Sequence, residues 1–333
     1  MSYSIKRIAS ELGISPSAVS FIINGKAAEK RISPELENQV KEFCEKVNYC
    51  PNIHARRMSS RLAKNIGFLI DERMCVDSEN PFSDQIISEI TGGVVLAAAR
   101  EGFRVTIRIY NSDMHEEDVF GWLRNKEIDG LIYYGLSFNK EWMDAFLREK
   151  RCVAGIGIEP IPGVSTVNIN NRELVRELAE AMIKKGRCRF LYLSGGDGYV
   201  SAQRLAGLKD ALSGAGISGE LNVINCNFSE NTAYFEMLKA NMSFDAIVCA
   251  NDDMALGAHR ALNERGISVP GEVSLSGADN IRAVRYTVPR LATLDNMNTA
   301  AGRAAFDALL KLVNGGNAQS TVLNSKIILN QSI

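Results

Sequence analysis

Apolar residues in the first 49 positions recur at the spacing of three short helices. In residues 5–12 they fall at i, i+3, i+4 and i+7, and Ser4 before them can cap a helix. The stretch Ser15–Gly25, SPSAVSFIING, begins with serine and proline and ends in glycine, which suits a second helix. A third helix can start at Ser33–Pro34. Two short helices joined around a glycine are typical of a helix-turn-helix.

From Asn65 onward, short apolar runs alternate with segments of helical periodicity. This alternation predicts an α/β fold with helices on both faces of parallel strands, in one large sheet or two smaller ones. The runs IEPIPG at 158–163 and PRLATLD at 289–295 interrupt the pattern, and we expect the chain to pass between two lobes there. The predicted strands span 65–70, 103–110, 129–134, 152–158, 165–169, 188–194, 221–226, 245–250, 273–278 and 321–329. The predicted helices span 84–101, 116–125, 140–149, 172–185, 201–213, 231–241, 253–265 and 298–313.

Composition narrows the class of protein. Hydrophobic residues make up 46% and charged residues 23% of the 333 positions, as in a globular protein with two or three structural units. No run approaches the roughly 18 apolar residues of a membrane span, and the N-terminus lacks the apolar core of a secretory signal. We therefore expect a cytoplasmic protein without membrane contact. Seven scattered cysteines without a C-x-x-C, and three isolated histidines, predict reduced thiols and no metal site.

Charge is distributed unevenly along the chain. Residues 1–65 hold 11 Lys/Arg and 6 Asp/Glu and so carry +5, whereas the remainder carries −6. A small basic head on a larger acidic body suggests a nucleic-acid-binding module joined to something else. The segment that follows Tyr49, CPNIHARRMSSRLAKN, can form a short helix from Ile53 to about Ser60 against a phosphate backbone, or it can remain a flexible linker.

Motifs in both parts resemble one family. The runs SIKRIASELGISPSAVSFIING and RISPELENQVKEFCEKVNYCPNIHARRM resemble the DNA-binding head of the lactose/galactose repressor (LacI/GalR) family. Four runs after predicted strands resemble motifs of that family's core: ENPFSDQI, LSGGDGYVSAQRLAGLKDAL, CANDDMALGAHRAL and SLSGADNIRAV.

The resemblance implies three parts of the chain. An N-terminal all-α helix-turn-helix domain is expected at 1–49, and a hinge helix and linker at 50–64. A two-lobed, periplasmic-binding-protein-like α/β core is expected at 65–333. Its N-lobe would comprise about 65–160 and 292–318, and its C-lobe about 161–291 and 319–333.

For the head, the resemblance implies a homodimer on double-stranded operator DNA, with the second helix in the major groove. Met58 stands where the family usually inserts a leucine wedge, and Phe21 where it commonly has an arginine. Phenylalanine can contact a thymine methyl but cannot grip guanine, so we expect an A·T base pair there, unless Phe21 turns inward. The expected DNA contacts are Lys6, Arg7, Ser15, Pro16, Ser17, Ser20, Phe21, Asn24, Asn52, His54, Ala55, Arg56 and Met58, with Lys26, Arg31 and Arg57 as further phosphate contacts.

For the core, the resemblance implies an effector bound beyond the strand ends, between the lobes. Planar Asp, Asn and Arg groups can bind adjacent hydroxyls as donors and acceptors, and an aromatic ring can cover the apolar face of a sugar. Asp252 has a competing role as a helix cap, which we favour. The expected effector-binding residues are Phe82, Tyr133, Tyr199, Arg204, Asn251, Asp279 and Asn296, with Tyr134 as an alternative aromatic.

Together these features predict a transcriptional regulator, as a repressor, controlled by a sugar or sugar derivative and needing no cofactor. An enzyme is disfavoured because the run Gly195–Gly198 lacks the third glycine of G-x-G-x-x-G and no P-loop motif occurs. A purine or nucleoside co-repressor in the same architecture stays open as an alternative. A sugar-transport binding protein would leave the basic head unexplained.

Overall fold

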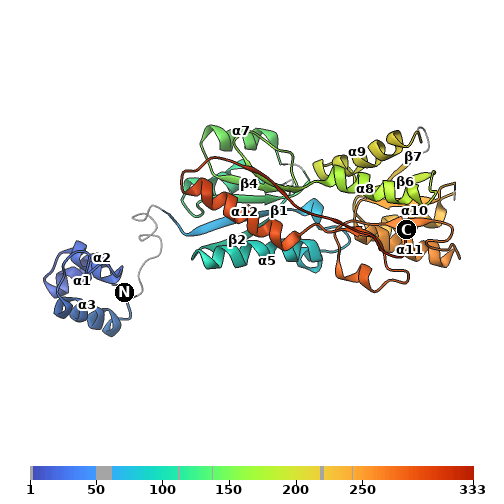
Figure 1. Ribbon diagram of the computed structural model, residues 1–333. Helices are drawn as coiled ribbons and strands as arrows, with labels where there is room; N and C mark the ends of the chain where they lie inside the picture. Colours follow the sequence, from blue (N-terminus) through green and yellow to red (C-terminus); the bar gives the residue numbers. More distant parts are fainter. Residues whose placement is uncertain (1–2, 50–61, 112, 137, 218–220, 242) are drawn as a thin grey trace. The chain divides into compact units, whose positions relative to one another are not determined.

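The computed structural model describes residues 3–49, 62–111, 113–136, 138–217, 221–241 and 243–333 (Figure 1). The chain divides into two compact units, Met1–Ala63 and Lys64–Ile333. The predicted hinge helix lies outside the described residues, as do the predicted DNA contacts Asn52, His54, Ala55, Arg56 and Met58 and the further phosphate contact Arg57. Over the described ranges, the structure contains no helix with the length and apolar character needed to span a membrane.

The first unit contains three helices where the sequence predicts them: α1 (Ile5–Leu12), α2 (Pro16–Ile23) and α3 (Pro34–Lys46). Each begins after a serine whose hydroxyl accepts a hydrogen bond from the backbone amide three residues on, at 3.1–3.3 Å. These caps are Ser4, Ser15 and Ser33.

A small apolar core holds the three helices together. Ile8 from α1, Val19 and Ile22 from α2 and Val40 from α3 are buried in it. After α2 the chain turns at Gly25, whose φ of 70° is a left-handed conformation that glycine adopts without strain. Because one side of α2 fills this core, its other side is left to face outward.

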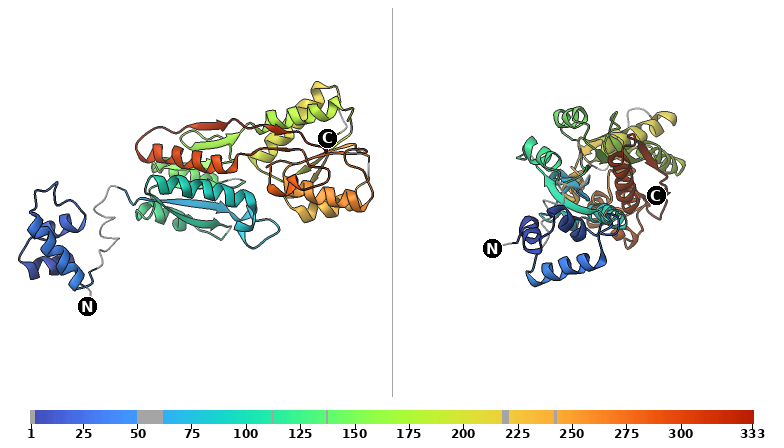
Figure 2. Two further views of the ribbon diagram at one scale, coloured as in Figure 1. Left: turned by 60° about the horizontal axis from the view of Figure 1, so that its bottom comes forward. Right: turned by 90° about the vertical axis from the view of Figure 1, so that its left-hand side faces the viewer.

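A six-stranded parallel sheet forms the first lobe of the second unit, in the order β11–β5–β4–β3–β1–β2. Helices α5 (Gln85–Arg100) and α12 (Asn298–Val313) pack together on one face, and α6 (Glu116–Arg124) and α7 (Lys140–Arg148) cover the other (Figures 1 and 2). The strands are β1 (Asn65–Asp71), β2 (Arg104–Tyr110), β3 (Leu131–Tyr134), β4 (Val153–Ile156), β5 (Ser165–Ile169) and β11 (Ser320–Leu323). Short 3-10 turns, η1 (Glu72–Met74) and η2 (Pro81–Ser83), follow β1.

A four-stranded parallel sheet forms the second lobe, in the order β7–β6–β8–β9. Its strands are β6 (Phe190–Ser194), β7 (Leu221–Asn225), β8 (Ala246–Cys249) and β9 (Ser274–Ser276). Helices α8 (Asn171–Lys184) and α9 (Tyr199–Gly214) lie on one face, and α10 (Glu230–Lys239) and α11 (Asp252–Glu264) on the other (Figure 1). The central strands β6 and β8 are buried along their whole length, as expected for parallel strands covered on both faces.

Three segments join the lobes. The chain passes from β5 into α8, and two further segments contain β10 (Thr293–Leu294) and β12 (Ile327–Ile328), which pair antiparallel. A 3-10 turn, η3 (Arg282–Arg285), precedes β10. The crossing predicted at 289–295 coincides with β10.

The lobe boundaries differ from the predicted ones in two places. The sequence predicts residues 161 onward in the second lobe, but β5 pairs in parallel with β4 in the first sheet. It also predicts 319–333 in the second lobe, but β11 pairs with β5. No helix separates β4 from β5, so the alternation of elements gives no indication of which sheet β5 joins. Pairing with β4 and β11 satisfies its backbone groups on both sides.

Candidate functional site

The outer face of α2 carries side chains that take no part in the core of the first unit. Ser17 is exposed, and Ser20 and Phe21 are half-buried. Phe21 is not among the residues packed on the core, and Nζ of Lys30 lies 5.3 Å from the centroid of its ring. The alternative that Phe21 turns inward therefore does not hold in this structure.

The cations of the first unit are accessible. Lys6 and Arg7 on α1 are exposed, and the Arg7 guanidinium stacks 4.5 Å from the centroid of the Tyr3 ring. Lys26, Lys30 and Arg31, which follow α2, are exposed as well. Among the other predicted DNA contacts in the described residues, Ser15, Pro16 and Asn24 are also exposed.

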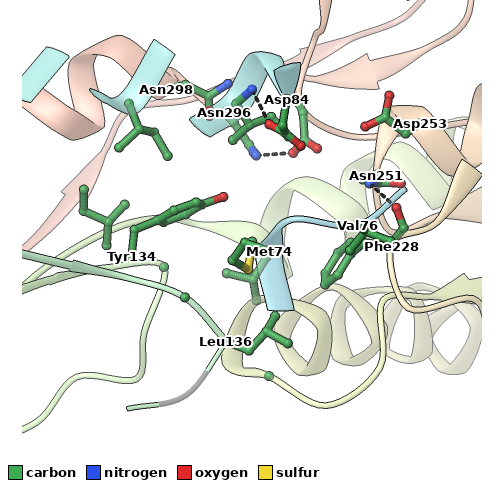
Figure 3. Close-up of a pocket in the computed structure, with 18 of the residues that line it drawn as sticks. Met74, Val76, Asp84, Tyr134, Leu136, Phe228, Asn251, Asp253, Asn296 and Asn298 are labelled. Atoms are coloured by element: carbon green, nitrogen blue, oxygen red, sulfur yellow. Dashed lines mark hydrogen bonds between the residues drawn. The ribbon is translucent and has the colours of Figure 1, made fainter. Parts of the chain in front are cut away.

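A cavity of about 450 Å³ lies between the two lobes of the second unit, at the carboxyl ends of both sheets. This volume is ordinary for a small-molecule pocket. Met74 and Val76 after β1 and Tyr134 at the end of β3 line it from the first lobe. Phe228 and Asn251 line it from the second lobe (Figure 3).

Arg204 is the centre of a buried polar network in this cavity. It projects from α9 and is only 2% exposed. Its Nε donates to Asn171 Oδ1 at 2.8 Å, and one terminal nitrogen donates to the Ala250 carbonyl. The other donates to Asp279 Oδ1 at 3.3 Å and Asn296 Oδ1 at 3.0 Å. The Asn296 amide in turn donates to Asp279 Oδ1.

Asp279 is held in this network by an unusual backbone. Its φ is 117°, in the left-handed range that L-residues rarely adopt, and its side chain is buried. Burial raises the pKa of its carboxyl group, while the Arg204 guanidinium acts in the opposite direction. Strain of this kind persists where the surroundings over-determine a conformation, as they do at ligand sites.

The helix cap at the start of α11 is Asn251 and not Asp252, which corrects the role favoured for Asp252. Asn251 Oδ1 accepts from the Met254 amide at 2.8 Å. Asp252 is fully buried and instead accepts from the Ile281 amide at 2.9 Å and the Thr293 hydroxyl at 2.6 Å. Burial raises the pKa of Asp252 to about 6, against these hydrogen bonds. Asp252 thus fastens the loop after β9 to β10.

Carboxyl groups dominate the charge of the cavity. Asp84 caps α5 through hydrogen bonds from the amides of Ile86 at 2.7 Å and Ile87 at 2.9 Å. The Asp253 carboxyl has no hydrogen bond or ion pair within the described part of the chain. Burial, and then the nearby carboxyl groups with Asp84 first, raises its pKa to about 7. The charged lining residues are Asp77, Asp84, Arg204, Glu230, Asp253 and Asp279.

Two hydrogen-bonded contacts join the lobes beside the cavity. Asp77, in the loop after β1, accepts from the Ser229 hydroxyl at 2.8 Å and from the Glu230 amide at 2.8 Å. These donors lie at the first residues of α10 in the second lobe. Gln85 Oε1 on α5 accepts from the Arg282 amide at 2.9 Å.

Two of the predicted effector residues do not line the cavity. Phe82 is 45% exposed on the surface. Tyr133 is fully buried on the opposite face of the first sheet, where its hydroxyl donates to Asp71 Oδ2 at 2.7 Å. Its neighbour Tyr134 lines the cavity instead, because successive residues of a strand point to opposite faces.

The other five predicted residues, Tyr199, Arg204, Asn251, Asp279 and Asn296, line the cavity together. Sequence reasoning missed further lining residues with polar or aromatic side chains. Asn171 and Asp253 stand in the first turns of helices that follow strands, a position that could have indicated them. The missed polar and aromatic lining residues are Asp77, Ser78, Ser83, Asp84, Gln85, Asn168, Asn171, Ser201, Phe228, Glu230, Asp253 and Asn298.

Known proteins resemble this chain in sequence and in structure. A model of the periplasmic binding protein-like domain matches residues 179–333. Catabolite control protein A of Staphylococcus xylosus is 28% identical over 323 residues, which cover 94% of this chain and 93% of the relative.

Solved structures share the fold over the full length. The lac repressor dimer bound to operator and the anti-inducer ONPF superposes with a TM-score of 0.83 at 19% identity, covering 100% of this chain and 99% of that one. The transcriptional regulator CelR in complex with cellobiose gives a TM-score of 0.73 at 22% identity, covering 99% and 100%.

The relative and the two solved structures match both units of the chain. The relative in Staphylococcus xylosus aligns along nearly the whole length, so head and core are matched together. Within the described residues, the motifs quoted from the sequence lie on α1, α2 and α3 and on segments that contain or follow the ends of β1, β6, β8 and β9. The chain is thus similar along nearly its whole length to catabolite control protein A, and it shares its fold with the lac repressor and with a LacI-family transcriptional regulator from Sanguibacter keddieii.

Proposed function

We propose that the protein is a sequence-specific DNA-binding regulator, acting as a repressor, whose operator affinity is set by a small molecule bound between the lobes. One observation carries this proposal: a single chain joins a head with an outward-facing α2 to a two-lobed core with a polar cavity. The operator-bound lac repressor and the cellobiose-bound regulator support it by likeness. The proposed function involves no catalysis and no cofactor. The regulator would act on chromosomal DNA in the cytoplasm.

Two heads of a homodimer would bind successive major grooves of a pseudo-palindromic operator, about 34–36 Å apart. Ser17, Ser20 and Phe21 on α2 are the base-reading candidates. Exposed Lys6 and Arg7 are candidates for phosphate contacts, so affinity should fall steeply with salt concentration.

The effector class that fits the cavity is a sugar or a sugar derivative. Asn251, Asp279 and Asn296 present amide and carboxylate groups suited to adjacent hydroxyls. The rings of Tyr134 and Phe228 offer apolar faces for a sugar ring. Because the cavity has walls from both lobes, a ligand that binds the closed form better shifts the lobe equilibrium, and operator affinity with it.

A gel shift of the full-length protein on its own promoter region tests the DNA-binding half of the proposal. Ser17→Asp places a negative charge on the exposed face of α2, and Gln39→Asp places the same charge on the exposed side of α3. We expect a salt-sensitive complex that Ser17→Asp weakens at least about tenfold and Gln39→Asp leaves nearly unchanged. Equal effects of the two changes, or no complex with wild-type protein, would contradict the assignment.

A thermal-shift screen of sugars, sugar derivatives, purines and nucleosides tests the effector half. A bound ligand should raise the Tm of wild-type protein. Asp279→Asn should abolish that rise, whereas Asp144→Asn, at an exposed position on α7, should preserve it. A ligand response that survives Asp279→Asn would place the ligand elsewhere, and a response to purines alone would favour a nucleoside co-repressor.

A further inference from the structure

We propose that the cavity takes an uncharged or amine-bearing polyol and excludes phosphorylated and carboxylated ligands. This inference rests on the proposed function, because it assigns a ligand class to the cavity through which the regulator is controlled. Its basis is the charge of the lining. Among the described residues that line the cavity there are five carboxyl groups and a single cationic group, that of Arg204.

Most N–H groups of Arg204 are already engaged and cannot bind an anion. A guanidinium has five N–H groups, and it grips a phosphate or carboxylate best with two of them in parallel. Four of the five already have acceptors, on Asn171, Ala250, Asp279 and Asn296. At most one N–H remains for a ligand, and the charge of the guanidinium is balanced by the buried Asp279 carboxyl.

The amides at three of the helix starts around the cavity are also occupied. Asp84 accepts from the first amides of α5, and Asn251 accepts from that of Met254 in α11. Asp77 accepts from the Glu230 amide of α10. Helices α8, α9 and α12 begin without a side-chain cap, so their first amides are the features of the described lining that favour an anion.

Among the carboxyl groups, by contrast, that of Asp253 can still accept hydrogen bonds from a ligand. The Asp253 side chain has no hydrogen-bond or ion-pair partner within the described ranges. It lies on α11 at the same cavity as Asp84, the cap of α5 (Figure 3). The carboxyl groups of Asp84, Asp252, Glu230 and Asp77 all raise its pKa beyond the effect of burial. An anion brought here would meet like charges at low dielectric, whereas ligand hydroxyls or an ammonium would supply the missing donors.

The charge preference of the cavity can be measured without knowing the ligand. Val200→Cys places a thiol of similar size on the cavity wall, beside the uncapped start of α9. Its rate of modification is compared for a trimethylammonium-bearing and a sulfonate-bearing methanethiosulfonate reagent at pH 8 and low salt. The native cysteines do not interfere, because the tryptic peptide 190–204 contains none of them. The same pair of rates in the denatured protein corrects for intrinsic reactivity.

We expect the corrected ratio of cationic to anionic rates to be about tenfold or more, because a cleft lined by one sign of charge concentrates the opposite ion. Adding Asp253→Asn should lower the ratio, as should pH 6, where the Asp253 carboxyl is largely protonated. Adding Asp144→Asn on the exposed side of α7 should not change it. Circular dichroism and Tm identify any variant that fails to fold.

A corrected ratio at or below one overturns the inference, as does a phosphorylated sugar or a carboxylic acid that raises the Tm of wild-type protein but not of Asp279→Asn. The gel shift on promoter DNA does not involve this reaction. The ligand class and the proposed function can therefore fail separately.

Discussion

Replacing Asp77 by alanine removes the two hydrogen bonds that join the loop after β1 to the start of α10. The Asp77 carboxyl accepts from the Ser229 hydroxyl and the Glu230 amide, both at 2.8 Å, so a group from one lobe caps a helix of the other. Both Asp77 and Glu230 also line the cavity. We therefore expect Asp77 to stabilise the closed arrangement of the lobes over a bound ligand.

The size of the effect follows from the exposure of the group. A hydrogen bond to a charged group contributes about 1.5–3 kcal/mol when it is shielded from water. Asp77 is exposed, and solvent screening reduces the pair of bonds together to about 1 kcal/mol. That corresponds to about a fivefold change in the equilibrium between closed and open lobes. Effector release should accelerate by up to the same factor.

Hydrogen exchange at the first amides of α10 measures the contribution of the Asp77 contact in the absence of a ligand. In Asp77→Ala the Glu230 amide should exchange about fivefold faster, while the amides of α8, in the same lobe but remote from this contact, should keep their rates. Asp77→Asn retains an acceptor oxygen, and asparagine tolerates the φ of 58° found at this position, so its effect should be smaller. Unchanged exchange at the start of α10 in Asp77→Ala would refute the idea that this contact holds the lobes together.

Three further predictions concern other parts of the molecule. The folded-state pKa of Asp253 is raised from 3.8 to about 7, so its protonated form stabilises the folded protein at low pH, and that stability is lost as the pH rises from about 4 through 7. Calorimetry should therefore show that Asp253→Asn raises the Tm at pH 8 but not at pH 4, and an equal gain at both would contradict this pKa. Arg204→Gln leaves the Asp279 carboxyl buried without its cation, and urea unfolding should show a loss of about 3–5 kcal/mol; a loss near zero would mean that the pair is not coupled. Phe21→Arg should enrich guanine at one half-site position when bound DNA is selected and sequenced, whereas unchanged selection would mean that residue 21 faces no base.

The helices of the head could be predicted because their determinants are local. Ser4, Ser15 and Ser33 each cap the helix that the sequence predicts, and the hydroxyl-to-amide bonds span only three residues. Gly25 likewise adopts the left-handed conformation expected after α2. Periodicity, caps and the glycine all indicate the same boundaries, so no distant contact was needed to choose between alternatives.

The assignment of strands to sheets depends on long-range pairing and was harder to predict. Strand β5 pairs with β11, more than 150 residues away in sequence, and Thr166 Oγ1 donates to Ser320 Oγ at 3.0 Å. Neither strand carries a local sequence feature that predicts which strand it pairs with. The helix preceding a strand usually indicates its side of the fold, and β5 has none, so the predicted crossing at 158–163 fell one strand too early.

The lining of the cavity was predictable where strand ends determine it. Asn251 and Asp279 follow β8 and β9, and parallel strands bring such positions to one edge of a sheet. Tyr133 and Phe82 were predicted wrongly for different reasons. Neighbouring strand residues alternate between faces, and both faces of this sheet are buried, so the pattern does not tell which tyrosine meets the cavity. Phe82 lies in a short 3-10 turn, for which periodicity gives no direction.

The Arg204 network also explains how such a cavity could discriminate between ligands. A ligand oxygen that accepts from the guanidinium must use its one remaining N–H or replace the amide oxygen of Asn296. Replacing Asn296 frees its amide and leaves Asp279 Oδ1 short of a donor, unless the ligand supplies a hydroxyl there. A vicinal diol does both, since one oxygen accepts from Arg204 while the other donates to Asp279. A ligand with an isolated acceptor leaves the buried Asp279 carboxyl one donor short, at a cost of about 1–3 kcal/mol. Preference for adjacent hydroxyls therefore follows from polar groups that the protein already pairs with one another.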